Sequence, residues 1–302
     1  MDQHLSSHRW LLTASLALTA IVSPLIQAGS PVADKNPALT PAVDWKQDTI
    51  SPVANPMFDE DPVIRSEVRP IFAYHHIDSG FITGAGDAEL YAMQIRYAIT
   101  DRLALIATED GYFDIHLKSG TNLSGWMDTA AGLKYALIDD VADQFILTPG
   151  FTFIIPTGSK HVFQGYGNGS WNPFISAEKG FGDFHVQTNV GFRIPDDNAQ
   201  STIFHYSLMA DYKVCQWFIP FVAANGFTVV QSGKNLPINS EGYDVIDFGS
   251  SLAKGTSQMT VAGGFRSRLA QNIDLGISYE VAVLKPYGLT QNRLTCDVSY
   301  RF

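Results

Sequence analysis

A period of two dominates the chain from about residue 67 to its last residue. In LYAMQIRYAIT (90–100), the polar side chains Gln94 and Arg96 fall on one face and the apolar side chains fall on the other. The segments DFHVQTNVGFRI (183–194) and NIDLGISYEV (272–281) repeat this alternation. Because successive side chains of a β-strand point to opposite faces, whereas a helix repeats every 3.6 residues, the pattern predicts strands.

About twelve such segments follow one another. They span 67–77, 88–99, 103–110, 126–137, 144–155, 171–179, 184–194, 201–212, 217–225, 258–269, 273–283 and 293–302. The even number matters, because a chain that threads up and down returns to its starting side only after an even count, as single-chain bacterial barrels do.

The connections between these segments alternate in length. After every second segment comes a short one: TDR, IDDVAD, GFGD, KVCQ and AQN. The intervening connections are mostly longer, and the longest runs from 226 to 257. Short periplasmic turns opposite longer outer loops are typical of outer-membrane barrels. The sequence therefore predicts an all-β fold, a transmembrane antiparallel up-and-down β-barrel in the outer membrane of a Gram-negative-type bacterium.

The two faces of the predicted strands differ in chemistry. A soluble sandwich would show the same alternation, but the polar face here is densely charged and suits a wet barrel interior. The apolar face would meet membrane lipid at Ile95, Leu133, Phe151, Val190 and Ile277, and it carries an aromatic cluster toward the short turns, Tyr97, Tyr135, Tyr212, Trp217, Tyr300 and Phe302. We expect the lumen to be lined by Arg96, Lys134, Arg193, Asp211, Arg266, Arg268, Asp274, Glu280, Asp297 and Arg301.

Several of these charges should meet near the short turns. Counting from the turns puts Arg268 and Asp274 at similar height on neighbouring strands, with Arg301 at the foot of the next strand and Arg266 and Asp297 slightly higher. Opposite charges at equal height on adjacent strands lie within pairing distance. We expect these pairs to hold the wall together; the alternative is a charge filter that narrows the lumen.

The region before the strands divides into two parts. Residues 1–28 combine Arg9 and an apolar run, and a Gly-Ser-Pro turn follows them, which is typical of a cleavable signal peptide. Residues 29–66 contain six prolines, scattered acids and no apolar period, and they are expected to form a periplasmic arm. Residues 67–302 are expected to form the barrel.

Composition excludes several classes of protein. The net charge of −10 argues against a nucleic-acid partner, which would need a basic face. Two cysteines, Cys215 and Cys296, are too few for a disulfide framework or a cysteine zinc site. No metal site and no cofactor are expected, because His75 and His76 are adjacent in a strand and point to opposite faces.

The chain ends in Tyr300-Arg301-Phe302, which resembles the C-terminal signal recognised by the barrel-assembly machinery of the outer membrane. The stretches GWMDTAAGLKYAL (125–137), GFTFIIPTGS (150–159) and NPFISAEKGFGDFHVQTNVGF (172–192) resemble the putative transporters of the MetA pathway of phenol degradation. The resemblance implies an outer-membrane channel in contact with lipid. It would pass small molecules, including hydrophobic or aromatic ones, by passive diffusion.

Two other functions stay open from the residues alone. One is a structural or surface-interaction barrel with a blocked lumen, and the other is a lipid-modifying barrel enzyme. His205, Ser207 and Asp211 share one strand face, but spacings of about 7 Å or more along a strand keep them out of direct contact. No enzymatic activity is therefore expected.

Overall fold

A computed structural model describes residues 44–285 and 287–302, and these residues form a single unit dominated by β-strands. Two short 3-10 helices, η1 (Trp45–Gln47) and η2 (Lys160–Val162), are the helical elements of this part of the chain. Within it, no helix has the length and apolar character needed to cross a membrane.

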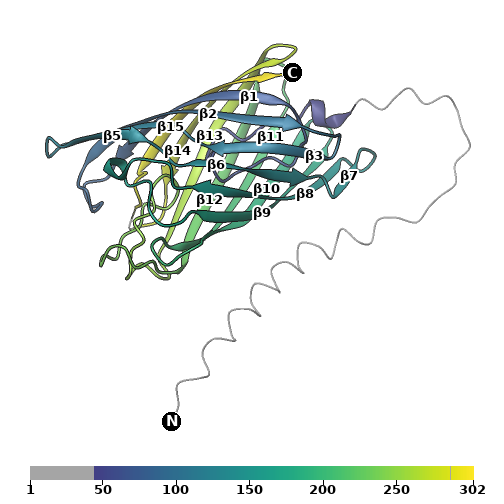
Figure 1. The fold of residues 1–302 in the computed structure, drawn as a ribbon. Helices are drawn as coiled ribbons and strands as arrows, with labels where there is room; N and C mark the ends of the chain where they lie inside the picture. Colours follow the sequence, from purple (N-terminus) through teal and green to yellow (C-terminus); the bar gives the residue numbers. More distant parts are fainter. Residues whose placement is uncertain (1–43, 286) are drawn as a thin grey trace, which may run out of the picture. The chain divides into compact units, whose positions relative to one another are not determined.

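The strands form one antiparallel sheet that closes on itself (Figure 1). Their bounds are β1 (Glu67–Ile77), β2 (Gly86–Ala98), β3 (Leu103–Glu109), β4 (Tyr112–Leu117), β5 (Asn122–Trp126), β6 (Thr129–Tyr135), β7 (Ile138–Asp140), β8 (Phe145–Ile155), β9 (Ser170–Phe181), β10 (Phe184–Pro195), β11 (Thr202–Tyr212), β12 (Ile219–Gln231), β13 (Ser257–Ala270), β14 (Ile273–Ala282) and β15 (Asn292–Arg301). From β8 to β15 successive strands pair with one another, β6 joins β8 to β3, and β1 pairs with both β2 and β15 to complete the ring.

The wall has twelve strands, as predicted, because some crossings are built from consecutive pieces. β3 and β4 form one crossing and both pair with β2, whereas β5, β6 and β7 together form the next. Short turns of 99–102, 141–144, 182–183, 213–218 and 271–272 lie at one end, which we call the short-turn end. The longer connections, including 156–169 and 232–256, lie at the opposite loop end.

The third and fourth crossings extend further than the alternation predicts. Register shifts between Ala107 and Glu109, and Gly111 follows with φ of 129°, a conformation that favours glycine. This bulge exchanges the inner and outer sides, so that Ile106 before it and Phe113 after it are both buried. The change of phase conceals β4 and β5 from a simple count of alternating residues.

The two faces of the wall separate apolar from charged side chains as expected. On the outer face Ile95 and Phe151 are about two-fifths exposed, and the aromatic group at the short-turn end is also exposed. The charged side chains of the opposite face are buried. A sheet with an apolar exterior and a buried, charged interior is the arrangement of a membrane barrel, which places this chain in the outer membrane.

The expected separation of the 29–66 arm from the barrel is wrong for residues 44–66. Ile50, Val53, Phe58 and Asp61 are almost completely buried, and they contact side chains of the inner wall. We call residues 44–66 the inner loop. The predicted signal peptide (1–28) and residues 29–43 of the predicted arm lie outside the described residues.

Candidate functional site: an occupied barrel lumen

The inner loop occupies the lumen from the short-turn end. It begins at Trp45, which packs with Ala136 and Ile146, and it reaches Phe58, whose ring lies 5.7 Å from that of Phe227. It then returns, because Ile64 packs against the same cluster as Trp45 before β1 begins. The inner loop is therefore a re-entrant segment with both ends near the short turns.

Glu60 is the most heavily bonded residue of the inner loop. Arg96 donates from Nε to its Oε1 over 2.9 Å, and Lys134 Nζ donates to the same oxygen over 2.7 Å. The Glu60 backbone carbonyl accepts from Ser176 Oγ at 2.5 Å and from Asn189 Nδ2 at 3.3 Å. The two predicted lumen cations Arg96 and Lys134 thus bind the inner loop instead of facing open water.

Wall arginines also hold backbone carbonyls of the inner loop. Arg69 donates to the Pro52 carbonyl over 3.0 Å, and Arg266 donates to the Ser51 carbonyl over 2.9 Å. Arg266 at the same time forms a two-point ion pair with Asp297, at 2.8 and 3.0 Å. Because a bidentate guanidinium fixes both distance and direction, Arg266 sets the position of this part of the inner loop.

The charges near the short turns pair, but not all with the expected partners. Arg268 is opposite Asp274 in the strand register, yet its guanidinium bonds to Asp48, at 3.4 Å, and to the Thr49 carbonyl, at 3.0 Å. Asp274 accepts from Arg301 over 3.0 Å. Arg268, which the sequence predicts to pair within the wall, therefore binds the inner loop instead.

The connection 232–256 closes the lumen from the loop end, and we call it the cap loop. Arg193 donates to its Tyr243 carbonyl at 3.0 Å and to Asp247 at 2.9 Å. Arg293 bridges Asp244 of the cap loop, at 2.5 Å, and Glu280 of β14, at 2.6 Å. Arg193 and Glu280, both predicted for the lumen, therefore help to hold a folded loop.

Glu241 organises the cap loop from within. Its carboxylate accepts from the backbone N–H groups of Gly242, Phe248 and Ser250 and from Ser201 Oγ. Burial, followed by the nearby charge of Asp247, raises the pKa of Glu241 to about 7. The protonation state of this loop residue therefore changes close to neutral pH.

The remaining predicted lumen residue, Asp211, lies at the short-turn end of β11. Its Oδ1 is 2.9 Å from Nδ1 of His185 on β10, and both side chains are buried. Glu178 of β9 lies beside them. Alternation along single strands does not bring Glu178 and His185 to Asp211, because the proximity of the three residues depends on the strand register.

The cavities of the barrel show how fully the lumen is occupied. A cavity of about 700 Å³ opens at the short-turn end, lined by Asp48, Lys213, Arg268 and Arg301 among others. Further in, the space between Glu109, Arg193 and the cap loop measures about 10 Å³. That volume holds about one water molecule, so little free space is left where Glu109 and Arg193 meet the cap loop.

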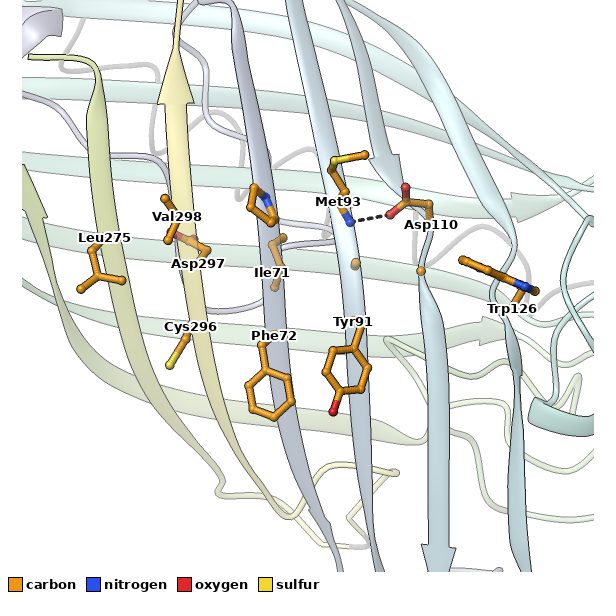
Figure 2. Close-up of a pocket in the computed structure, with 13 residues that line it drawn as sticks. Ile71, Phe72, Tyr91, Met93, Asp110, Trp126, Leu275, Cys296, Asp297 and Val298 are labelled. Carbon is orange, nitrogen blue, oxygen red and sulfur yellow. Dashed lines mark hydrogen bonds between the residues drawn. The ribbon is translucent and has the colours of Figure 1, made fainter. Parts of the chain in front are cut away.

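A separate groove of about 590 Å³ lies on the outer face of the wall (Figure 2). Figure 2 shows Phe72, Tyr91 and Met93 lining it, with Trp126 at one side. It follows the break between β3 and β4, where the Met93 N–H donates to Asp110 Oδ1 over 2.8 Å. Asp110 thereby replaces a missing ladder partner on a surface that faces lipid.

The residues considered for catalysis are not brought together. His205 Nε2 lies 2.8 Å from Asn172 Oδ1, and Ser207 Oγ accepts from Asn55 of the inner loop at 3.3 Å. His75 is buried and bonds to Thr290, whereas His76 is partly exposed and bonds to Asp87. His205 and Ser207 thus support packing in the lumen.

Comparison with solved structures supports the same fold. The chain is similar to the COG4313 outer membrane channel from Pseudomonas putida F1, with 17% identity, a TM-score of 0.57, and coverage of 84% of this chain and 100% of that one. It is also similar to the KdgM porin, with 13% identity, a TM-score of 0.45, and coverage of 77% and 99%.

No family model matches the chain, and no curated protein matches it. The resemblance to transporters of the MetA pathway therefore stays a prediction. The fold of the chain is that of an outer-membrane β-barrel, closed by twelve strands and filled by its own inner loop and cap loop.

Proposed function

We propose that this protein is an outer-membrane channel for small molecules, and that the described structure is its closed state. The observation that carries the proposal is that a separate chain segment, the inner loop, fills the lumen. A barrel closed by wall side chains could open only by deforming its sheet. A re-entrant segment that enters and leaves at one end can move while the wall stays intact.

The contacts of the inner loop suit a reversible closure. It is held by ion pairs at Glu60 and Asp61 and by arginine bonds to its carbonyls, and these polar contacts can be exchanged for water. Its apolar contacts are confined to small groups such as Ile50 and Val53 against Met209 and Phe221. Solutes would cross the opened lumen by passive diffusion, selected by its wall charges.

Planar-bilayer recordings test the proposal. The full protein is expected to show little steady conductance, and a variant without residues 46–64 should conduct at least tenfold more. A milder variant, Glu60→Ala with Asp61→Ala, loosens the same segment without shortening the chain and should give frequent transient openings. Asp87→Asn, in an exposed pair with His76, is the matched control and should behave as the parent protein.

The main alternative is a structural or surface-interaction barrel with a permanently blocked lumen. This alternative is favoured by the ion pairing of the inner wall, because Arg96, Lys134 and Arg266 each have a buried acidic partner. The alternative predicts that the shortened variant, once shown to be folded by heat-modifiable migration, conducts no more than the parent. Liposome swelling with a sugar and with an aromatic acid would rank solute classes for the opened variant.

A further inference from the structure

Three side chains on neighbouring strands meet inside the wall near the short-turn end. Glu178 of β9, His185 of β10 and Asp211 of β11 are 1%, 0% and 2% exposed. Their potential ligand atoms all lie within 4.8 Å of one another. All three residues belong to the wall itself, and none of them makes an ion pair with the inner loop or the cap loop.

The cluster is short of hydrogen-bond donors. Both carboxylate oxygens of Glu178, Oδ2 of Asp211 and Nε2 of His185 are buried without a hydrogen-bond partner. Among the residues that the structure describes, no lysine or arginine nitrogen lies within 4.0 Å of either carboxylate. Burying two carboxylates without direct compensation is costly, so the site favours uptake of a proton or binding of a cation.

The positive side chains of the neighbourhood are already bound elsewhere. Arg65 and Arg268 act on this cluster only through space. The Arg65 guanidinium bonds to Asp61 at 3.5 Å, and the Arg268 guanidinium bonds to Asp48 at 3.4 Å. Neither can neutralise Glu178 without giving up its own partner.

We propose that Glu178, His185 and Asp211 form a binding site for a divalent transition-metal ion of the zinc class. Zinc accepts imidazole nitrogen and carboxylate oxygen at about 2.0–2.2 Å, which places its ligand atoms roughly 3–4 Å apart. His185 Nδ1 and Asp211 Oδ1, at 2.9 Å, are close to that separation, and small movements of the three side chains complete the set. The imidazole disfavours magnesium and calcium, which prefer oxygen ligands alone.

The ring of an inner-loop residue lies over the cluster, and a cavity is lined by residues next to it in the sequence. The ring of Trp45, in the first turn of the inner loop, lies 6.0 Å from the His185 ring at 34°. Lys213 directly follows β11, and Gln47 ends the helix of Trp45; both line the 700 Å³ cavity at the short-turn end. An ion from that cavity would bind beneath Trp45 and tie three wall strands together.

Isothermal titration of the purified full-length protein with zinc chloride, after treatment with a chelator, tests the site. One ion per chain is expected to bind with micromolar or tighter affinity and to raise Tm. Glu178→Gln removes one carboxylate without changing its shape and should weaken binding at least tenfold. In the metal-free protein, the same substitution should raise Tm, because it relieves the repulsion between Glu178 and Asp211. Asp211→Asn provides a second variant.

The fluorescence of Trp45 can show whether the ion binds at this cluster. Cobalt(II) should quench the fluorescence of the parent protein, and the quenching should disappear in Trp45→Phe and in Glu178→Gln. His205→Gln is the matched control, because His205 on β11, like His185 on β10, is buried with one ring nitrogen unpartnered. The proposal is overturned if the parent protein binds no zinc, if Glu178→Gln binds it as tightly as the parent, or if His205→Gln loses binding to the same extent.

Discussion

Arg96 of β2 encloses the carboxylate of Glu60 in the inner loop, with Nε 2.9 Å from Oε1 and Nη2 2.5 Å from Oε2. Both side chains are at most 5% exposed. The contact joins the wall to the segment that fills it, and Lys134 reinforces it from β6. The closed lumen is therefore held by an ion pair whose two charges must become hydrated when the inner loop moves.

Glu60→Ala should lower the free energy of unfolding by about 3–5 kcal/mol, because it leaves Arg96 and Lys134 buried without their partner. The measurement is denaturant unfolding of the folded barrel in detergent. Asp87→Ala removes one member of the exposed pair with His76 and should cost about 0–1 kcal/mol. Equal losses in the two variants would contradict the role given to Glu60.

Ile277→Arg should destabilise the barrel by about 2–4 kcal/mol, because Ile277 is on the lipid-facing side near the middle of β14. Val283→Arg, just beyond the loop end of the same strand, should cost only about 0–1 kcal/mol, because a long side chain there can reach water. Unfolding in lipid vesicles measures both. If Val283→Arg proves the more damaging change, the depth assignment of β14 is wrong.

Asp110→Leu should cost about 1–3 kcal/mol, because it leaves the Met93 N–H without an acceptor beside the break between β3 and β4. Asp110→Asn retains an oxygen at the same place and should be milder. Hydrogen exchange at Met93 gives the site-specific readout, with faster exchange expected in the leucine variant alone. Unchanged protection in that variant would show that Asp110 is not the acceptor that matters.

Glu241 should make the cap loop less stable as pH rises from about 4.5 to 7. Its folded pKa, about 7, exceeds its ordinary value of 4.5, so the folded loop binds the proton more tightly than the unfolded chain does. Its contribution to stability is therefore complete below about pH 4.5 and is lost as pH passes 7. Hydrogen exchange of residues 241–250 measures this, and Glu241→Gln should flatten the profile relative to Asp101→Asn, an exposed turn control.

Phe302→Asp should impair insertion into the outer membrane, because the terminal aromatic pair resembles the signal read by the assembly machinery. Tyr300 and Phe302 are 48% and 63% exposed, with ring centroids 6.2 Å apart, so they are accessible for recognition. The yield of heat-modifiable barrel in isolated outer membranes is the measurement. Phe181→Asp, at another exposed aromatic position of the short-turn end, is the control. A normal yield for Phe302→Asp would contradict the role of Phe302 in the assembly signal.

The amino-acid sequence by itself determined the wall of the barrel. Strands such as 184–194 and 273–283 could be predicted because a lipid-facing sheet obliges every second residue to be apolar, a local rule that single segments display. The alternation of short and long connections predicted that the strands run up and down around the barrel. The same rule failed after Ala107, where a register shift reverses the alternation and hides β4 and β5.

The tertiary structure alone decided what fills that wall. Residues 44–66 have no period, and they bind through backbone carbonyls and acids such as Glu60, whose partners on β2 and β6 lie 36 and 74 positions away. The meeting of Glu178, His185 and Asp211 likewise depends on the register of three strands. Alternation reports which way a side chain points, whereas occupancy of a lumen depends on which distant segments are folded into the same space.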